Sequence, residues 1–138
     1  MKTKPQIAWQ LASDTVINDS VTKKISIIGM FDDINISTEA NSVYLPFCII
    51  SRIRGIESTE QSKLFKTEIY DPDGEKFSET IVASAIPQSN INLVSRFPLK
   101  EISKIGSYRV NVSIDGVEVD NSNGPVFNVK KKQPANER

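Results

Sequence analysis

The chain is 138 residues long, which suits one domain that buries a hydrophobic core of its own. Its 17 Lys and Arg residues equal its 17 Asp and Glu residues, so the composition lacks the basic excess that draws proteins to nucleic acid or anionic membranes. A single cysteine excludes an intramolecular disulfide, and the absence of histidine excludes Ser-His-Asp catalysis, Cys-His catalysis and histidine-containing metal sites.

Eight or nine short runs have the alternating or continuous apolar pattern of β-strands. In chain order they are residues 7–11, 24–31, 43–53, 64–70, 75–82, 91–99, 108–114, 117–119 and 126–129. Turn signals separate them about every 8–12 residues, and no run has the period of a strong amphipathic helix. The pattern predicts an all-β fold, an immunoglobulin-like antiparallel β-sandwich of about 7–9 strands.

The first strands carry signals that place them in a sheet. Residues 7–11 have the pattern of an edge strand, and the polar pair Ser13-Asp14 predicts a turn after it. In residues 43–53 the odd positions form an apolar row, which predicts that this face lies in the core. Pro46 has no backbone donor, so we expect a sheet edge or a bulge at this point.

The middle of the chain alternates strands with polar segments. Residues 55–63 are polar and predict a mobile loop. Residues 64–70 alternate, and their odd positions are predicted to point inward. Asp71-Pro72-Asp73-Gly74 predicts a tight turn, because proline stands early and glycine last. Residues 83–89 are expected to be irregular.

The segment around Tyr108 predicts a rigid part of the frame. Asp115-Gly116 tolerates positive φ and predicts a type I′ hairpin in which Ile114 faces Val117. Gly106-x-Tyr108, with Leu99 upstream at the end of an alternating strand, resembles the tyrosine corner of immunoglobulin-like sandwiches. We therefore expect the Tyr108 hydroxyl to bond the backbone a few residues upstream.

The ends of the chain differ from its middle in composition. Residues 7–129 are expected to form one domain, preceded by a flexible N-terminus over residues 1–6. Residues 130–138 are charged and contain proline, which predicts a disordered tail rather than a nucleic-acid site. No apolar run approaches the roughly 20 residues that cross a bilayer, and the start lacks the apolar core of a secretion signal. We therefore expect a cytoplasmic protein.

The remaining reactive side chains have ordinary structural interpretations. Cys48 is expected to be a buried, inert thiol, because nothing adjacent in the sequence stabilises a thiolate. Asp32 and Asp33 are neighbours at a strand end, where alternation points their side chains apart. Asp71 and Asp73 belong to a turn, and a calcium site needs more oxygen donors than they supply. We expect no cofactor and no catalytic residue.

Two of the predicted strands, 24–31 and 43–53, carry apolar residues on both faces, and a sheet that is apolar on both sides must be covered. The cover comes either from this chain, through the segment with Trp9 and Leu11 or through residues 102–105, or from a protein partner. The candidate partner surface on the second face consists of Tyr44, Cys48, Ile50, Ile28 and Met30.

Several strand and turn segments together resemble a family of small uncharacterised bacterial proteins of unknown function. These segments are residues 12–17, residues 24–34, the long strand ending at Ile53, and residues 69–74. The resemblance covers most of residues 7–129, and it implies a cytoplasmic β-sandwich without known catalytic residues. Many relatives have a Gly-x-His element before the strand that here begins at Leu64, where this chain has Gln61-Ser62-Lys63.

We expect a non-catalytic binding or scaffolding module that acts through a protein–protein interface, with self-association included. The alternative is a small-ligand or glycan-binding domain that uses loops at one end of the sandwich, near Asp32, Asp33 and residues 55–63. A carboxylate-dependent hydrolase is the remote alternative. A sandwich fold by itself does not distinguish these functions.

Overall fold

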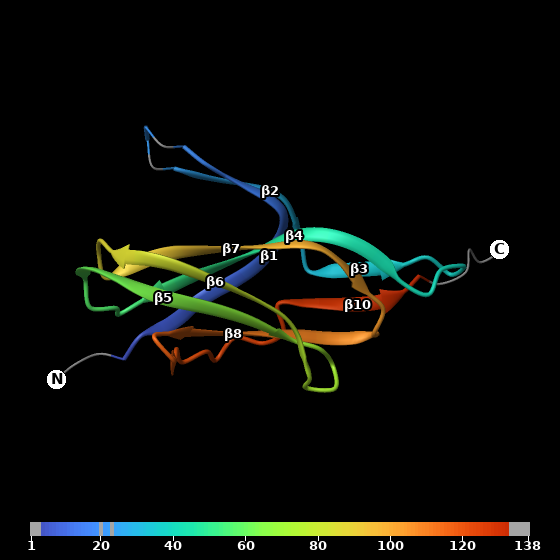
Figure 1. Ribbon diagram of the computed structural model, residues 1–138. Coiled ribbons are helices and arrows are strands. Elements are labelled where there is room, and N and C mark those ends of the chain that lie inside the picture. The colour runs from blue at the N-terminus through green and yellow to red at the C-terminus, as the bar shows by residue number, and fades with distance from the viewer. Residues whose placement is uncertain (1–3, 20, 23, 133–138) are drawn as a thin grey trace.

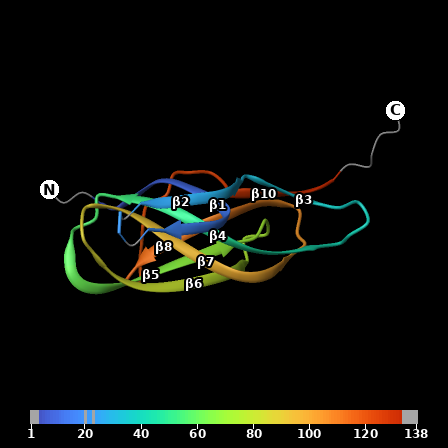
Figure 2. The same cartoon turned by 90° about the horizontal axis from the view of Figure 1, so that it is seen from above.

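The computed structural model describes residues 4–19, 21–22 and 24–132, which form two β-sheets whose strands run along the long axis of the molecule (Figure 1, Figure 2). Its strands are β1 (Gln6–Asn18), β2 (Ile25–Phe31), β3 (Asp33–Ile36), β4 (Val43–Arg54), β5 (Thr59–Tyr70), β6 (Lys76–Ile86), β7 (Asn90–Ile102), β8 (Gly106–Ile114), β9 (Val117–Glu118) and β10 (Phe127–Lys131). Among the described residues, no helix is long and apolar enough to cross a bilayer.

The four-stranded sheet is antiparallel, with the order β2-β1-β4-β7. The six-stranded sheet has the order β3-β10-β8-β5-β6, and β9 pairs with β8. This second sheet is mixed, because β3 runs parallel to β10. The prediction of an all-β fold is confirmed, whereas the immunoglobulin-like arrangement of the strands stays a prediction.

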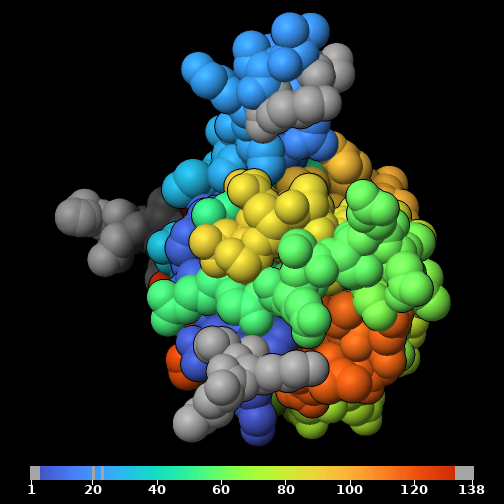
Figure 3. Space-filling model, turned by 90° about the vertical axis from the view of Figure 1, so that its left-hand side faces the viewer, coloured from blue at the N-terminus to red at the C-terminus, as the bar shows by residue number. Residues whose placement is uncertain are grey.

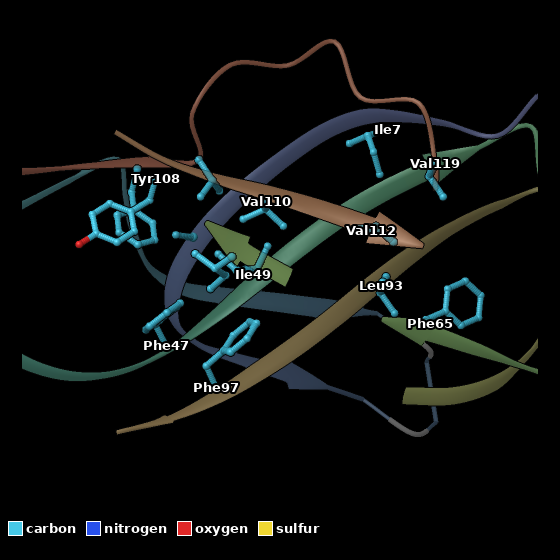
Figure 4. Packing of buried hydrophobic residues seen from close by; sticks show 14 of the residues in the cluster. Ile7, Phe47, Ile49, Phe65, Leu93, Phe97, Tyr108, Val110, Val112 and Val119 are labelled. Carbon is cyan, nitrogen blue, oxygen red and sulfur yellow. The ribbon is translucent and has the colours of Figure 1, made fainter. Parts of the chain in front are cut away.

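One core fills the space between the sheets, and aromatic rings dominate one part of it (Figure 4). The rings of Tyr108 and Phe127 stack with centroids 4.9 Å apart, and Phe47 stacks on Phe97 at 5.3 Å. Phe47 also meets Phe127 edge to face at 5.8 Å, so the two stacked pairs form one continuous group. The odd positions of β4 and β5 point into this core, as their alternation predicts.

The frame around Tyr108 is as the sequence predicts. The Tyr108 hydroxyl donates to the carbonyl oxygen of Lys104 at 2.9 Å, four residues upstream. Asp115 and Gly116 have φ values of 48° and 85°, and Ile114 pairs with Val117 across this turn. The tyrosine hydrogen bond and the two-residue hairpin are therefore confirmed.

The edge strand predicted over residues 7–11 is only the first part of a longer strand: residues 7 and 9–11 pair with β4 and not with β2, whose pairing begins at Ala12. β1 continues to Asn18 and lies between β2 and β4. Ser13, predicted to begin a turn, is buried, and its hydroxyl donates to the carbonyl oxygen of Thr15 at 3.3 Å. Because this bond satisfies the polar side chain within its own strand, the serine does not end the strand.

Parts of two segments, one predicted as a loop and one as irregular, belong to strands. β5 begins at Thr59 rather than at residue 64, and Lys63 pairs with Ser84 of β6, which continues to Ile86. Most side chains in this part of β5 are exposed, so the strand forms without the apolar alternation that marks a buried face. β3 is a further strand that the sequence analysis did not predict.

A bulge changes which side chains of β7 enter the core. Leu45 pairs with Lys100 and Phe47 with Phe97, so Pro46 stands opposite two residues of β7 at a bulge, one of the two arrangements predicted for it. Beyond the bulge the alternation of β7 shifts by one residue. Leu99 is therefore exposed, although it continues the odd-numbered apolar positions of the strand predicted over residues 91–99.

The boundaries predicted at the two ends need small changes. β1 begins at Gln6, inside the segment predicted to be flexible, and β10 extends to Lys131, inside the predicted tail. Lys130 and Lys131 belong to a strand because they pair with Asn35 and Ile36 of β3. Of the predicted flexible ends, residues 1–3 and 133–138 lie outside the described residues.

Candidate partner-binding surface

The second half of β1 and β2 form a hairpin that stands out from the body of the protein. β1 pairs with β4 as far as Ser13, opposite Cys48, and from there it pairs with β2 alone. We call residues 13–19, 21–22 and 24–30 the projecting hairpin. It bends back above β7 in Figure 1 and forms the uppermost part of the molecule in Figure 3.

Backbone and side-chain bonds shape the tip of this hairpin. The Asp19 amide donates to the carbonyl oxygen of Lys24 at 2.9 Å, which closes the ladder. Asp19 Oδ1 accepts the amides of Val21 at 2.8 Å and Thr22 at 3.1 Å. Both bonds lower the pKa of the Asp19 carboxyl, and the bond from the Thr22 amide has the larger effect. The carboxylate at the tip therefore stays ionised near neutral pH.

The inward face of the projecting hairpin covers the second face of the four-stranded sheet. Val16 of the hairpin is buried with Cys48 and Ile50 of β4, in a cluster separate from the main core. Leu11, Ile25, Ile27 and Val94 pack around it. The Arg96 guanidinium of β7 donates to the carbonyl oxygen of Val16 at 3.2 Å and ties the hairpin to the sheet. Most of this cover is therefore provided by the chain itself.

A glycine allows the two strands of the hairpin to lie this close. Gly29 has a φ of +72°, a conformation that other residues rarely adopt. A Cβ atom at this position would collide with the Asp14 carboxylate, which lies directly across the ladder. Both the backbone angle and the contact therefore require glycine.

The outward face of the hairpin carries exposed aliphatic side chains. Ile28 is 47% exposed, Met30 64% and Ile17 52%. Ile28 pairs with Thr15 and Ile17 with Ser26, positions that alternate with the Val16–Ile27 pair, so both point away from the side that holds Val16. Met30 continues the alternation of Ile28 along β2 and is the most exposed of the three. We call Ile17, Ile28 and Met30 the outward patch. β2 is also an edge strand, with one side that pairs with no other described strand.

The five residues of the candidate surface therefore divide into three groups. Ile28 and Met30 are exposed on the hairpin, whereas Cys48 and Ile50 are buried beneath it. Tyr44 is exposed near the start of β4, away from the hairpin. The negative charge of the Glu101 carboxylate, and a hydrogen bond to it, raise the pKa of the Tyr44 phenol. Sequence reasoning did not include Ile17, although its parity, opposite to that of Val16, could have indicated it.

A groove of about 440 Å³ lies between the projecting hairpin and β7. Asn18 and Ile25 line it from the hairpin. Val82, Ser84 and Ala85 of β6, with Pro87 and Gln88 just after that strand, line it from the other side. Two arginines, Arg52 and Arg96, also line the groove. The Arg52 guanidinium donates to Asn92 Oδ1 at 3.1 Å.

The carboxylates considered for catalysis are engaged in ordinary contacts. Asp33 pairs with Lys130 at 3.3 Å, and Lys104 Nζ lies 3.0 Å from Asp71 and 2.9 Å from Asp73. The hydrogen bond from Lys104 lowers the pKa of Asp71, which also accepts two backbone amides of its own turn. Within the described part of the chain, no group of three or more His, Cys, Asp or Glu residues is placed to hold a metal ion.

The loops of the ligand-binding alternative do not come together. β3, which begins at Asp33, and the connection between β4 and β5 lie toward opposite ends of the molecule (Figure 1). The connection instead borders a hollow of about 770 Å³ beside the β8–β9 hairpin. Ile56, Ile86, Ile114 and Val119 supply apolar lining to this hollow.

The fold and this surface define an all-β protein of two sheets from which one hairpin projects. The chain belongs to a family described as a family of unknown function (DUF6941), whose model matches residues 8–123. The resemblance stated from the sequence is confirmed to this extent, and the bacterial origin that it implies stays a prediction. No curated protein matches the chain.

Proposed function

We propose that this protein is a non-catalytic binding or scaffolding module that contacts a protein partner, which can be a second copy, through the outward patch. One observation carries the proposal: a projecting hairpin is buried on one face and exposes Ile17, Ile28 and Met30 on the other. The immunoglobulin-like sandwich and the cytoplasmic location belong to the same proposal.

The position of the patch supports binding over a purely structural role. Aliphatic side chains gathered on an exposed element gain free energy when a partner removes them from water. The neighbouring edge of β2 contains no proline, so its backbone groups can also pair with an added strand. Single exposed aliphatic residues are common, but here three of them lie at alternating positions of one two-stranded ladder.

The test uses a photo-crosslinking amino acid at position 30 in the native host cell, with position 117 of β9 as the matched exposed control. We expect a crosslinked protein, or a crosslinked dimer, from position 30 but not from position 117. Ile28→Asp in the same chain should abolish that product, while Ile81→Asp, at a somewhat more exposed aliphatic residue on β6, should not. Equal products from both crosslinker positions, or no effect of Ile28→Asp, would overturn the proposal.

A second candidate function is small-ligand or glycan binding in the hollow beside the β8–β9 hairpin, because its apolar lining and volume suit a small molecule. Sugars, nucleotides and Ca²⁺ should be screened by thermal unfolding, where a ligand raises Tm by mass action. Support requires a rise in Tm that Ile114→Asn removes. The absence of any rise across the panel would exclude this candidate.

A further inference from the structure

We infer that the groove between the projecting hairpin and β7 binds carboxylate side chains of an acidic segment of a protein partner. The inference deepens the proposed function and rests on it, since the groove adjoins the hairpin that carries the outward patch. It assigns to Arg52 and Arg96 a role in recognising the partner.

The register of β4 and β7 sets the spacing of the two arginines. Arg52 pairs with Asn92, Ile50 pairs with Val94, and Cys48 pairs with Arg96. The two cationic residues thus stand four residues apart along the sheet, about 13 Å at a strand's rise of roughly 3.3 Å per residue. An extended segment that runs along the strands places side chains at the same spacing when they are four residues apart.

The two guanidiniums have unused capacity to bind anions. Arg52 makes one hydrogen bond to the Asn92 side chain, and Arg96 makes one to the Val16 carbonyl oxygen. Among residues 4–19, 21–22 and 24–132, no carboxylate forms an ion pair with either of them. A guanidinium has five N–H donors, so several remain for a carboxylate in bidentate geometry.

The rest of the groove reinforces this preference for anions. None of the residues that line it is Asp or Glu, so the two positive charges are not offset within the groove. Amide side chains at its rim add neutral donors, those of Asn18, Gln88, Asn90 and Asn92. A carboxylate entering here meets two guanidiniums, amide and hydroxyl groups that can donate to it, and apolar side chains, but no other carboxylate among the lining residues.

The chemistry favours an acidic protein segment over nucleic acid. A nucleic acid presents a continuous row of phosphates and gains affinity from many cations and from stacked aromatic rings. This groove offers two arginines, and the chain as a whole has no net charge. The outward patch, which belongs to the same hairpin but does not line the groove, supplies aliphatic contacts that a protein partner can use and a phosphate backbone cannot.

The experiment titrates fluorescein-labelled hexaglutamate with the full chain at low ionic strength and measures fluorescence anisotropy. Labelled hexaglutamine and oligothymidylate of the same charge are the comparison probes. Arg52→Gln and Arg96→Gln should each weaken hexaglutamate binding about tenfold, since one charge-assisted hydrogen-bond pair accounts for a change of that size. Arg109→Gln, an exposed arginine on β8 in the other sheet, removes the same charge and should leave binding unchanged.

Arg96 also ties the hairpin to the sheet, so Arg96→Lys provides a second variant. It keeps the positive charge and should bind hexaglutamate more tightly than Arg96→Gln does, and circular dichroism should show both variants folded. The inference is overturned if hexaglutamate does not bind, if Arg109→Gln weakens binding as much as the groove variants, or if oligothymidylate binds equally well.

The crosslinking test keeps the two proposals distinguishable. If the crosslink at position 30 depends on Ile28 while hexaglutamate fails to bind, the acidic-segment inference fails and the binding module stands. If hexaglutamate binds through Arg52 and Arg96 while the crosslink is absent, the outward patch fails as the interface and the groove stands as an anion site.

Discussion

Asp14 lies directly across the β1–β2 ladder from Gly29, and its carboxylate fills the space that a side chain at position 29 would need. This contact joins the two strands of the projecting hairpin. The hairpin in turn covers Cys48 and Ile50, so the packing of the second cluster depends on it.

Gly29→Ala should destabilise the protein by about 2 kcal/mol, because the new methyl group meets Asp14 and because alanine disfavours positive φ. Urea unfolding measures the effect. Gly124→Ala is the control, since a Cβ there meets nothing within 4 Å and should change stability little. The double variant with Asp14→Ala should recover part of the loss. If Asp14→Ala restores nothing, the contact is not what requires glycine.

The thiol of Cys48 should report on the cover that the hairpin provides. Cys48 is buried under Val16, so a thiol reagent should label the native protein slowly and the urea-unfolded protein at once. Gly29→Ala should raise the native labelling rate by loosening the hairpin. Tyr108→Phe alters the other sheet and is the control. When the two variants are compared under conditions of equal overall stability, Tyr108→Phe should not raise the labelling rate of Cys48. Fast labelling of the unaltered protein would contradict this account of the second face.

Tyr108→Phe should cost about 1 kcal/mol of stability, the usual net value of one hydrogen bond, because it leaves the Lys104 carbonyl oxygen without its phenol donor. Urea unfolding is again the measurement. Crosslinking from position 30 should persist in this variant, because Tyr108 belongs to the frame and not to the outward patch. Loss of the crosslink in a folded Tyr108→Phe protein would contradict the assignment of Tyr108 to the frame rather than to the binding surface.

The turn at Asp71 should make stability depend on acidic pH. The hydrogen bond from Lys104 lowers the pKa of Asp71 below its ordinary 3.8, so the unfolded chain takes up a proton first as pH falls. The contribution of Asp71 is therefore complete above about pH 4 and is lost as pH falls through the lower pKa of the folded state. Thermal unfolding measured from neutral to acidic pH should show a shallower loss of Tm for Asp71→Asn than for the unaltered chain. Parallel curves would show that the ion pair contributes nothing.

The parts of this fold that local sequence determines were predictable. The alternation of β4, the bulge at Pro46, the turn at Asp115-Gly116 and the Tyr108 hydrogen bond each depend on residues within a few positions of one another. Their residue types leave few alternatives for the backbone, so a pattern in the sequence identifies them directly.

The parts of the fold that depend on contacts between distant residues could not be predicted from the sequence. The sequence around Ser13 predicts a turn, but in the structure the Ser13 hydroxyl bonds the backbone of its own strand. β3 forms because Ile34 pairs with Val129, which lies far along the chain. The same limit applied to the candidate surface. Apolar residues on both faces of β4 correctly indicated that a cover is needed, but only the return of Val16 over Cys48 shows that the hairpin supplies most of it.

The parallel pairing of β3 with β10 also has a consequence for the order of folding. β3 has no other strand partner among the described residues, and β10 follows it by about ninety positions in the chain. This edge of the six-stranded sheet can therefore form only after almost the whole sequence has been synthesised. Until then Ile34 and Ile36 have no neighbouring strand to hold them against the core. Contacts between such distant segments slow folding, and this edge of the sheet should be the last to assemble and among the first to open.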